Sequence, residues 1–192
     1  EYLAGIADKK STMEKLSDGG AKGLSTFMAY YILTTAKETC GAGTAVAMLK
    51  EYYGGMLDKG ATTFWEDFDV DWIKDSGRID EIPENGLKDV HGDYGKFCYT
   101  GFRHSLCHGW SCGPIAFITE TILGVKVSDG GKTIEIAPSL CGLKFAKGSI
   151  PTPYGKVEIF HKQTESGVET EIYAPKEIKI VANDCNFTIK DL

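Results

Sequence analysis

The sequence predicts an α+β protein in two parts: a set of antiparallel helices, and then an antiparallel β-sheet or β-sandwich. Three observations support this prediction. In the first half apolar residues recur at helical spacing, and glycines interrupt them at short intervals; in the last third apolar and polar residues alternate with a period of two. The change of period places the boundary near residues 125–131, so we divide the chain into residues 1–126 and 127–192.

The helices of the first part are predicted from their apolar stripes and their ends. Ser11 and Glu14 have the Ser-x-x-Glu spacing of a capping box, which predicts a short helix that ends near residues 19–20. A second helix ends at the glycines 41 and 43, and a third ends at residues 54–55. The stripes of the second and third helices are Leu24, Phe27, Met28, Tyr31 and Thr35, and Val46, Leu49 and Tyr53.

Between residues 67 and 106 the helical period fails. The segment is rich in acids, glycines and aromatic residues, and we expect a long, ordered and partly structured loop. Pro114 then begins a helix with Ile115, Ile118 and Ile122 on one side, and Gly124 ends it. Strands are predicted at residues 133–136, 156–159 and 168–172.

The composition narrows the classes of function. The chain has 192 residues, of which 42% are hydrophobic and 25% are charged, enough for one large or two small cores. The net charge of −6 argues against a nucleic-acid partner, and no apolar run is long enough for membrane insertion. The first residues read as the middle of a helix, so we expect a piece of a longer polypeptide. Periplasmic, extracellular and cytoplasmic locations all remain open.

The cysteines do not predict a disulfide framework or a metal site. The chain has 6 cysteines without a compact pattern, and we expect mostly buried thiols. Five potential zinc ligands lie close together in the sequence, but their intervals fit no common zinc site, so we predict no metal. These residues are Cys98, His104, Cys107, His108 and Cys112.

The segment at residues 60–66, Gly-Ala-Thr-Thr-Phe-Trp-Glu, carries the clearest chemical signal. A carboxyl group beside an indole ring loses solvation, which disfavours its charged form and makes Glu66 a candidate general acid or base. Aromatic faces also stack on the C–H faces of sugars, so the segment indicates carbohydrate chemistry. The alternative is an ordinary acid at a helix N-terminus, stabilised by the helix dipole.

Four segments resemble, in order, the C-terminal part of bacterial α-L-rhamnosidases. They are residues 60–66, 105–110 (Ser-Leu-Cys-His-Gly-Trp), 134–138 (Ile-Glu-Ile-Ala-Pro) and 148–157 (Gly-Ser-Ile-Pro-Thr-Pro-Tyr-Gly-Lys-Val). The resemblance implies the last part of an (α/α)6 catalytic barrel followed by a β-sandwich domain. It also implies hydrolysis of terminal α-L-rhamnosides with inversion, without a cofactor. The implied partners are a rhamnose-containing glycoside or polysaccharide and the missing N-terminal part of the same polypeptide.

The same resemblance implies roles for three residues. Glu66 corresponds to the general base that activates water, His108 to a ligand of the sugar hydroxyls, and Trp65 to the aromatic packing behind the base. The general acid of the family lies upstream, outside this chain. Two features depart from the family pattern: the interval between Glu66 and His108 is longer than typical, and Cys107 stands where asparagine is expected.

Further candidates come from the residues alone, each with a plainer alternative. Trp72 and Trp110 are candidates for a sugar subsite, or they are core aromatics. Asp67 is a candidate for binding a sugar hydroxyl or orienting the base, or it belongs to a solvated acidic surface. His108 is equally compatible with a buried structural histidine.

Two rival functions belong to other classes. Residues 109–113 fit the Gly-x-Ser-x-Gly pattern of a serine hydrolase with Ser111 as the nucleophile, but that pattern needs a preceding strand in a parallel sheet, and the preceding segment is polar. The other rival is a non-catalytic module, in which the β domain binds carbohydrate on aromatics such as Tyr154 and Phe160, or serves only for packing.

Overall fold

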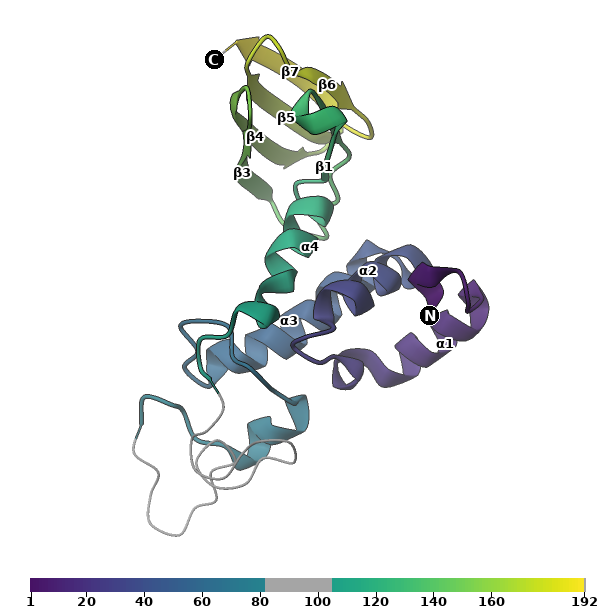
Figure 1. The fold of residues 1–192 in the computed structure, drawn as a ribbon, viewed down its shortest axis with the longest axis vertical. Coiled ribbons are helices and arrows are strands. Elements are labelled where there is room, and N and C mark those ends of the chain that lie inside the picture. Colours follow the sequence, from purple (N-terminus) through teal and green to yellow (C-terminus); the bar gives the residue numbers. More distant parts are fainter. Residues whose placement is uncertain (82–104, 192) are drawn as a thin grey trace. The chain divides into compact units, whose positions relative to one another are not determined.

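The computed structural model describes residues 1–81 and 105–191, and the chain divides into two compact units, Glu1–Ile115 and Ala116–Leu192 (Figure 1). The first unit is helical, and the described strands all lie in the second. The predicted α+β class and the order of helices before strands are therefore confirmed. Within the described ranges no helix is both long and apolar enough to cross a membrane.

The first unit is built from short 3-10 helices and longer α-helices. Helix α2 packs against both α1 and α3, and the single residue Gly41 separates α2 from α3. In chain order the elements are η1 (Tyr2–Ala4), α1 (Lys9–Gly19), η2 (Gly20–Gly23), α2 (Ala29–Cys40), α3 (Ala42–Asp58), η3 (Val70–Asp75), η4 (Gly109–Cys112) and α4 (Gly113–Thr121), whose last residues enter the second unit.

Helix α1 begins earlier than the capping-box pattern predicts. Its N-cap is Asp8, whose carboxylate accepts hydrogen bonds from the backbone N–H of Ser11 at 3.0 Å and from the Ser11 hydroxyl at 2.6 Å. These hydrogen bonds lower the pKa of Asp8. The assignment of Ser11 as the capping residue is therefore wrong, because Ser11 supplies the donor and Asp8 the acceptor. The predicted end is confirmed, with Gly20 as the C-cap.

The apolar stripe predicted for α2 is not its buried side. Phe27, Met28 and Tyr31 are 57%, 41% and 52% exposed, and Leu24, which is buried, precedes the helix. The covered side carries Leu33 and otherwise small side chains, which let neighbouring helices pack closely. The buried residues of α2 are Ala29, Leu33, Ala36 and Thr39.

The side predicted to be buried in the Pro114 helix also differs from the structure. Of the three predicted isoleucines, Ile122 is buried, but Ile115 and Ile118 are 56% and 40% exposed, and Phe117 is buried instead. The predicted start at Pro114 is right to within one residue, since α4 begins at Gly113.

Helix α3 does not end at its paired glycines but continues to Asp58. Gly55 is buried inside the helix, and a Cβ atom there would lie 2.7 Å from Ile73 Cδ1 and 3.0 Å from Phe68 Cζ. The predicted stop is wrong because this glycine serves close packing. Without a side chain at Gly55, Phe68 and Ile73 can pack directly on the helix.

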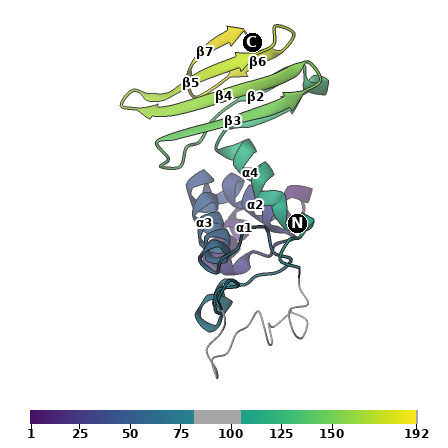
Figure 2. The same ribbon diagram turned by 90° about the vertical axis from the view of Figure 1, so that its left-hand side faces the viewer.

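The second unit contains two sheets, of orders β1-β2-β6 and β3-β4-β5-β7, and Figure 2 shows the second of these as adjacent ribbons. The predicted strands are confirmed as β2 and as parts of β4 and β5. Antiparallel pairing is confirmed for β1 with β2, β3 with β4 and β4 with β5, but β6 and β7 pair in parallel with β2 and β5. The strands are β1 (Val125–Ser128), β2 (Thr133–Ile136), β3 (Phe145–Thr152), β4 (Gly155–Thr164), β5 (Gly167–Ala174), β6 (Lys179–Ala182) and β7 (Asn186–Asp191).

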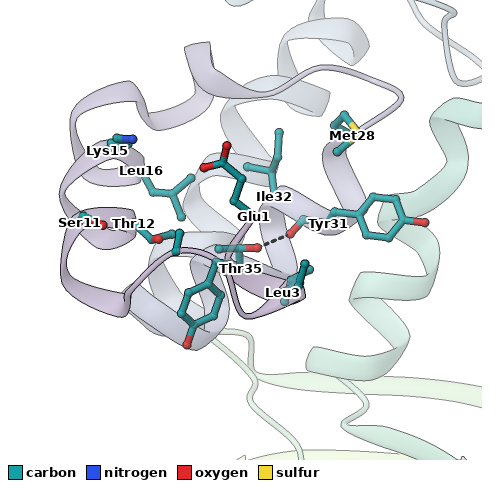
Figure 3. Close-up of a pocket in the computed structure, with 13 residues that line it drawn as sticks. Glu1, Leu3, Ser11, Thr12, Lys15, Leu16, Met28, Tyr31, Ile32 and Thr35 are labelled. Atoms are coloured by element: carbon teal, nitrogen blue, oxygen red, sulfur yellow. Dashed lines mark hydrogen bonds between the residues drawn. The ribbon is translucent and has the colours of Figure 1, made fainter.

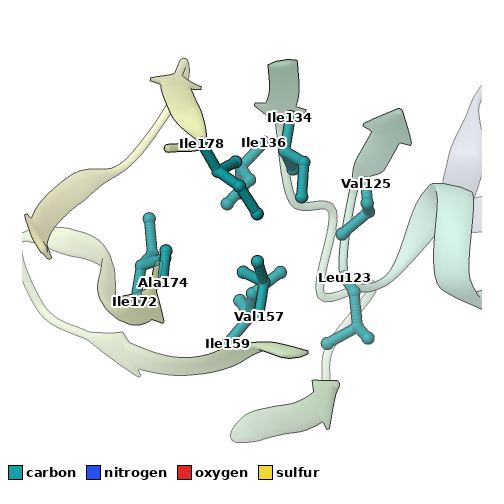
Figure 4. Close-up of a cluster of buried hydrophobic side chains, with 9 residues drawn as sticks. All are labelled: Leu123, Val125, Ile134, Ile136, Val157, Ile159, Ile172, Ala174 and Ile178. Carbon is teal, nitrogen blue, oxygen red and sulfur yellow. The ribbon is translucent and has the colours of Figure 1, made fainter. Parts of the chain in front are cut away.

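Both sheets contribute to one hydrophobic core. The side chains of this core point toward one another from the two sheets (Figure 4), and on β4 and β5 the residues between the core positions lie on the opposite side of the sheet. The core residues are Leu123, Val125, Ile134, Ile136, Val157, Ile159, Ile172, Ala174 and Ile178.

His161 is a fully buried polar residue of this unit, with 0% of its surface exposed. Its Nε2 lies 3.1 Å from the carbonyl oxygen of Leu123, and its Nδ1 lies 2.7 Å from the hydroxyl of Thr170. A neutral ring satisfies both contacts, with Nε2–H as the donor and Nδ1 as the acceptor. Burial lowers the pKa of His161, which favours this neutral form.

Candidate functional site

Two of the segments that resemble rhamnosidases lie side by side in the helical unit. The backbone N–H of Glu66 donates to the carbonyl of Ser105 at 2.8 Å, and the N–H of His108 donates to the carbonyl of Phe64 at 2.8 Å. The Thr63 hydroxyl also donates to the Leu106 carbonyl. These backbone contacts bring Glu66 and His108 together although many residues separate them in the sequence.

The Glu66 carboxylate lies at the centre of this arrangement and is 18% exposed. Its Oε2 accepts a hydrogen bond of 2.7 Å from the backbone N–H of Ser105. The Nδ1 atom of His108, whose side chain is 31% exposed, lies 3.9 Å from the same oxygen. That distance is too long for a hydrogen bond but permits an ionic attraction when the imidazole is protonated. Glu66 is therefore anchored on one side and still reachable by water.

The backbone that carries Glu66 is held by side chains from elsewhere in the unit. The carbonyl oxygen of Glu66 accepts hydrogen bonds from the Thr26 hydroxyl at 2.5 Å and from the Trp110 Nε1–H at 3.0 Å. The carbonyl of Trp65 accepts a hydrogen bond of 2.5 Å from the Ser111 hydroxyl. Sequence reasoning missed Thr26, since no local pattern distinguishes it from any other threonine in a turn.

Trp110 is the aromatic residue of the site that solvent reaches. Its ring is 48% exposed and lies 4.3 Å from the His108 ring, centroid to centroid, at an interplanar angle of 48°. Phe27 contacts the Trp110 ring edge to face at 5.5 Å. Trp110 thus combines an exposed face with a fixed orientation, which a platform for a sugar requires.

Trp65 and Trp72 occupy a different environment from Trp110. They are 0% and 7% exposed, and both lie edge to face with Phe68, at 6.0 and 6.4 Å. Neither ring has a face open to a ligand, which favours the core-aromatic alternative for Trp72. The packing role that the resemblance implies for Trp65 is compatible with this position. Asp67 is partly buried, and its Oδ1 accepts a hydrogen bond of 2.9 Å from the N–H of Phe68.

Ser111 does not have the geometry of a nucleophile. Its side chain is 0% exposed, its hydroxyl donates to the Trp65 carbonyl, and it lies in η4 rather than after a strand. A nucleophile elbow instead presents an exposed hydroxyl between a strand and a helix. The serine-hydrolase alternative is therefore wrong, because the Gly-x-Ser-x-Gly spacing arises in a short helical turn.

The cysteines also differ from expectation. Among the described residues the cysteines are free, with Cys107 and Cys112 exposed and Cys40, Cys141 and Cys185 partly exposed, so the prediction of buried thiols is wrong for them. In the same part of the chain no group of three or more His, Cys, Asp or Glu residues is arranged to hold a metal ion. Cys98 and His104, from the sequence cluster considered above, lie outside the described residues.

Two hollows of the helical unit lie apart from the Glu66 carboxylate. One of about 440 Å³ lies between η1, α1 and α2 (Figure 3), where Met28, Tyr31 and Thr35 form part of its wall. Part of the predicted stripe therefore lines this hollow. A smaller one of about 200 Å³ is bounded by the end of α3 and residues 61–64. Neither is lined by Glu66 or His108.

Comparison with known proteins gives a likeness in fold. No protein-family model matches the chain, and no curated protein sequence does. The crystal structure of a GH78 family rhamnosidase of Bacillus sp. GL1 matches it with a TM-score of 0.69 and 22% identity, over 100% of this chain and 19% of that chain. An α-L-rhamnosidase from Dictyoglumus thermophilum matches with a TM-score of 0.54 and 22% identity, over 82% of this chain and 15% of that chain.

At these identities the likeness concerns the fold. The chain spans less than a fifth of the length of either rhamnosidase. The resemblance seen in the sequence is confirmed at this level: the chain shares the fold of the matched parts of these two rhamnosidases.

Proposed function

We propose that this chain is the C-terminal part of a glycoside hydrolase that cleaves terminal α-L-rhamnosides with inversion of configuration. Residues 1–126 would complete an (α/α)6 catalytic barrel, and residues 127–192 would form the β-sandwich domain that follows it. The substrate is a rhamnose-containing glycoside or polysaccharide. Glu66 is the general base, and His108 and Trp110 contact the sugar in the subsite where the bond is cleaved.

One observation carries this proposal: the Glu66 carboxylate is anchored by a hydrogen bond to Oε2, and 18% of its side chain stays open to water. Oε2 accepts from the Ser105 N–H, and within the described part of the chain no hydrogen bond to Oε1 is found. Oε1 is thus placed to accept a proton from water. The two hydrogen bonds to the Glu66 carbonyl fix the backbone of this residue. They limit the number of other conformations that would move the carboxylate away from its reactive position.

The proposed step is the attack of water on the anomeric carbon. Glu66 takes one proton from the water while the oxygen forms its bond to the carbon on the face opposite the leaving group. A second carboxyl group, roughly 6.5–9.5 Å away, protonates the leaving oxygen in such enzymes. We place that acid in the part of the protein that precedes this chain. We therefore expect no turnover from residues 1–192 alone, because one half of the carboxyl pair is missing.

The neighbouring residues would bind and orient the sugar. The His108 imidazole offers a ring nitrogen to a sugar hydroxyl, and its contact with the Trp110 ring restricts its rotation. The exposed face of Trp110 can pack against the C–H face of the sugar ring. Asp67, next to the base, is a further candidate for contact with a hydroxyl.

The test is the turnover of an aryl α-L-rhamnoside by the complete protein that contains this chain. In the Glu66→Gln variant the carboxamide cannot accept the proton, and we expect kcat to fall by about 10²–10⁴-fold. Glu38→Gln is the matched control, because Glu38 is an exposed acid of the same unit. Its turnover should equal that of the wild type. Near-normal turnover by Glu66→Gln, or release of the α anomer of rhamnose as the first product, would refute the proposal.

A further inference from the structure

The outward side of the β3-β4-β5-β7 sheet carries a hollow that the proposed catalytic role does not use. Its volume is about 280 Å³, slightly below the roughly 300 Å³ at which small-molecule pockets begin. Its walls include Lys147 on β3, Glu158 and Phe160 on β4, and Glu171 and Tyr173 on β5. It therefore lies across three neighbouring strands of one unit.

The register of the strands explains why these side chains share one side. Phe160 pairs with Lys147 on one neighbouring strand and with Glu171 on the other, and Tyr173 pairs with Glu158. Laterally paired residues point to the same side of a sheet, and the alternate residues of the same strands belong to the core. The hollow thus has an aromatic ring at its centre and charged groups on both sides.

A hydrogen-bond network fixes the polar wall of the hollow. Lys190 Nζ lies 3.1 Å from both the Glu171 Oε2 atom and the Tyr173 hydroxyl, and it stands 5.1 Å from the centroid of the Tyr173 ring. The Tyr173 hydroxyl donates to Glu171 at 3.3 Å. Lys190 and Lys156 lower the pKa values of Glu171 and Glu158, respectively, through hydrogen bonds. Both carboxylates are therefore charged acceptors at neutral pH.

The balance of charge selects the class of ligand. Lysines and glutamates are mixed on this side of the sheet, so neither an anionic nor a cationic polymer meets a field of one sign. A neutral polyhydroxylated ring fits better: its hydroxyls can donate to Glu158 and Glu171 and accept from Lys147. Its C–H face can pack on Phe160, beside which Phe145 extends the aromatic surface at 6.4 Å and is 62% exposed.

We propose that this hollow is a binding site for one residue of a neutral oligosaccharide, separate from Glu66. We call it the sheet site and define it by Lys147, Glu158, Phe160, Glu171 and Tyr173. It lies entirely within the second unit and does not rest on the proposed catalytic function. The site would hold a polysaccharide on the protein whether or not the helical unit contributes to hydrolysis.

In the test, sugars are titrated into the isotope-labelled full chain, and the chemical shifts of its backbone amides report binding. The probes are methyl α-L-rhamnoside, cellohexaose and xylohexaose as neutral sugars, with a galacturonic acid hexamer as the anionic comparison. We expect saturable shifts in β4 and β5 with at least one neutral probe at millimolar concentration. We expect no such shifts with the anionic hexamer.

Three variants test the assignment. Phe160→Ala should weaken binding about tenfold, and Tyr173→Phe, which keeps the ring and removes only the hydroxyl, should weaken it severalfold. Phe187→Ala is the matched control, because Phe187 is 46% exposed but pairs with the buried Thr170 and so lies on the other side of the same sheet. It should bind as the wild type does.

Four results would overturn the proposal. They are the absence of saturable shifts with every neutral probe, equal weakening by Phe160→Ala and Phe187→Ala, tighter binding of the anionic hexamer, and shifts that follow protein concentration, which would identify a second copy as the occupant. His108→Ala separates the two proposals: it should abolish shifts that arise at the Glu66 site and leave those in β4 and β5 unchanged.

Discussion

Replacing Ser111 by alanine tests how the site is supported. The hydroxyl is fully buried and donates to the Trp65 carbonyl at 2.5 Å, next to the residue that carries the proposed base. Ser111→Ala removes this one hydrogen bond with almost no change of volume. A buried neutral hydrogen bond contributes about 1 kcal/mol, and more when its loss leaves a polar group poorly solvated, so we expect a loss of about 1–2 kcal/mol.

Urea unfolding followed by tryptophan fluorescence measures this loss directly. Trp65, Trp72 and Trp110 all lie in the helical unit, so the signal reports that unit alone. With a slope of about 1.5 kcal/mol per molar urea, the midpoint should fall by about 1 M while the slope stays constant.

The control is Thr62→Ala, which deletes an exposed hydroxyl from the same segment. It should change the free energy of unfolding by less than about 0.5 kcal/mol. The reasoning fails if Ser111→Ala costs no more than Thr62→Ala. It also fails if a fluorophosphonate labels Ser111 in the folded protein, since that requires an exposed and reactive hydroxyl.

Unfolding experiments check two further predictions, one in each unit. Gly55→Ala should destabilise the helical unit by about 1–3 kcal/mol, because its new methyl group would lie 2.7 Å from Ile73 Cδ1; Gly54→Ala, with nothing within 4 Å, should stabilise it by up to about 1 kcal/mol. The opposite order in urea midpoints would contradict the packing at Gly55. Burial holds the pKa of His161 in the folded chain below its ordinary value of 6.5. At a pH between the folded-state pKa and 6.5, the unfolded chain therefore binds a proton at this residue that the folded chain does not. Stability of the second unit should therefore fall as the pH drops below 6.5, by at most about 1.4 kcal/mol per pH unit, and His161→Gln should remove this slope in unfolding followed by circular dichroism. An unchanged slope in the variant would show that other groups cause it.

The predictions that succeeded depended on local patterns. The helix-to-strand order follows from the change of hydrophobic period, and β2 follows from the alternation in Thr133–Ile136. The end of α1 follows from glycines, which take backbone conformations that other residues avoid. These features need only neighbours in the chain, and for that reason the sequence alone could predict them.

The predictions that failed depended on contacts between distant residues. The paired glycines of α3 look like a helix stop until Phe68 and Ile73 are seen packed on Gly55. The predicted apolar stripe of α2 looks like its core side, but Leu33 and three smaller residues form the buried side. The parallel pairing of β6 with β2 and of β7 with β5 is also non-local, because the paired strands do not follow one another in the chain and no hairpin turn joins them.

The candidate site shows the same division. By itself the sequence determined which residue types are present, a carboxylate after two aromatics and a histidine in a second segment, together with the resemblance that gave them roles. Only the tertiary structure decided that the Ser105 N–H binds the Glu66 carboxylate, that Thr26 and Trp110 hold the Glu66 carbonyl, and that Trp110 is exposed while Trp65 is buried. The physical reason is that hydrogen bonding and burial depend on distance in space, and the chain brings these groups together only when it folds.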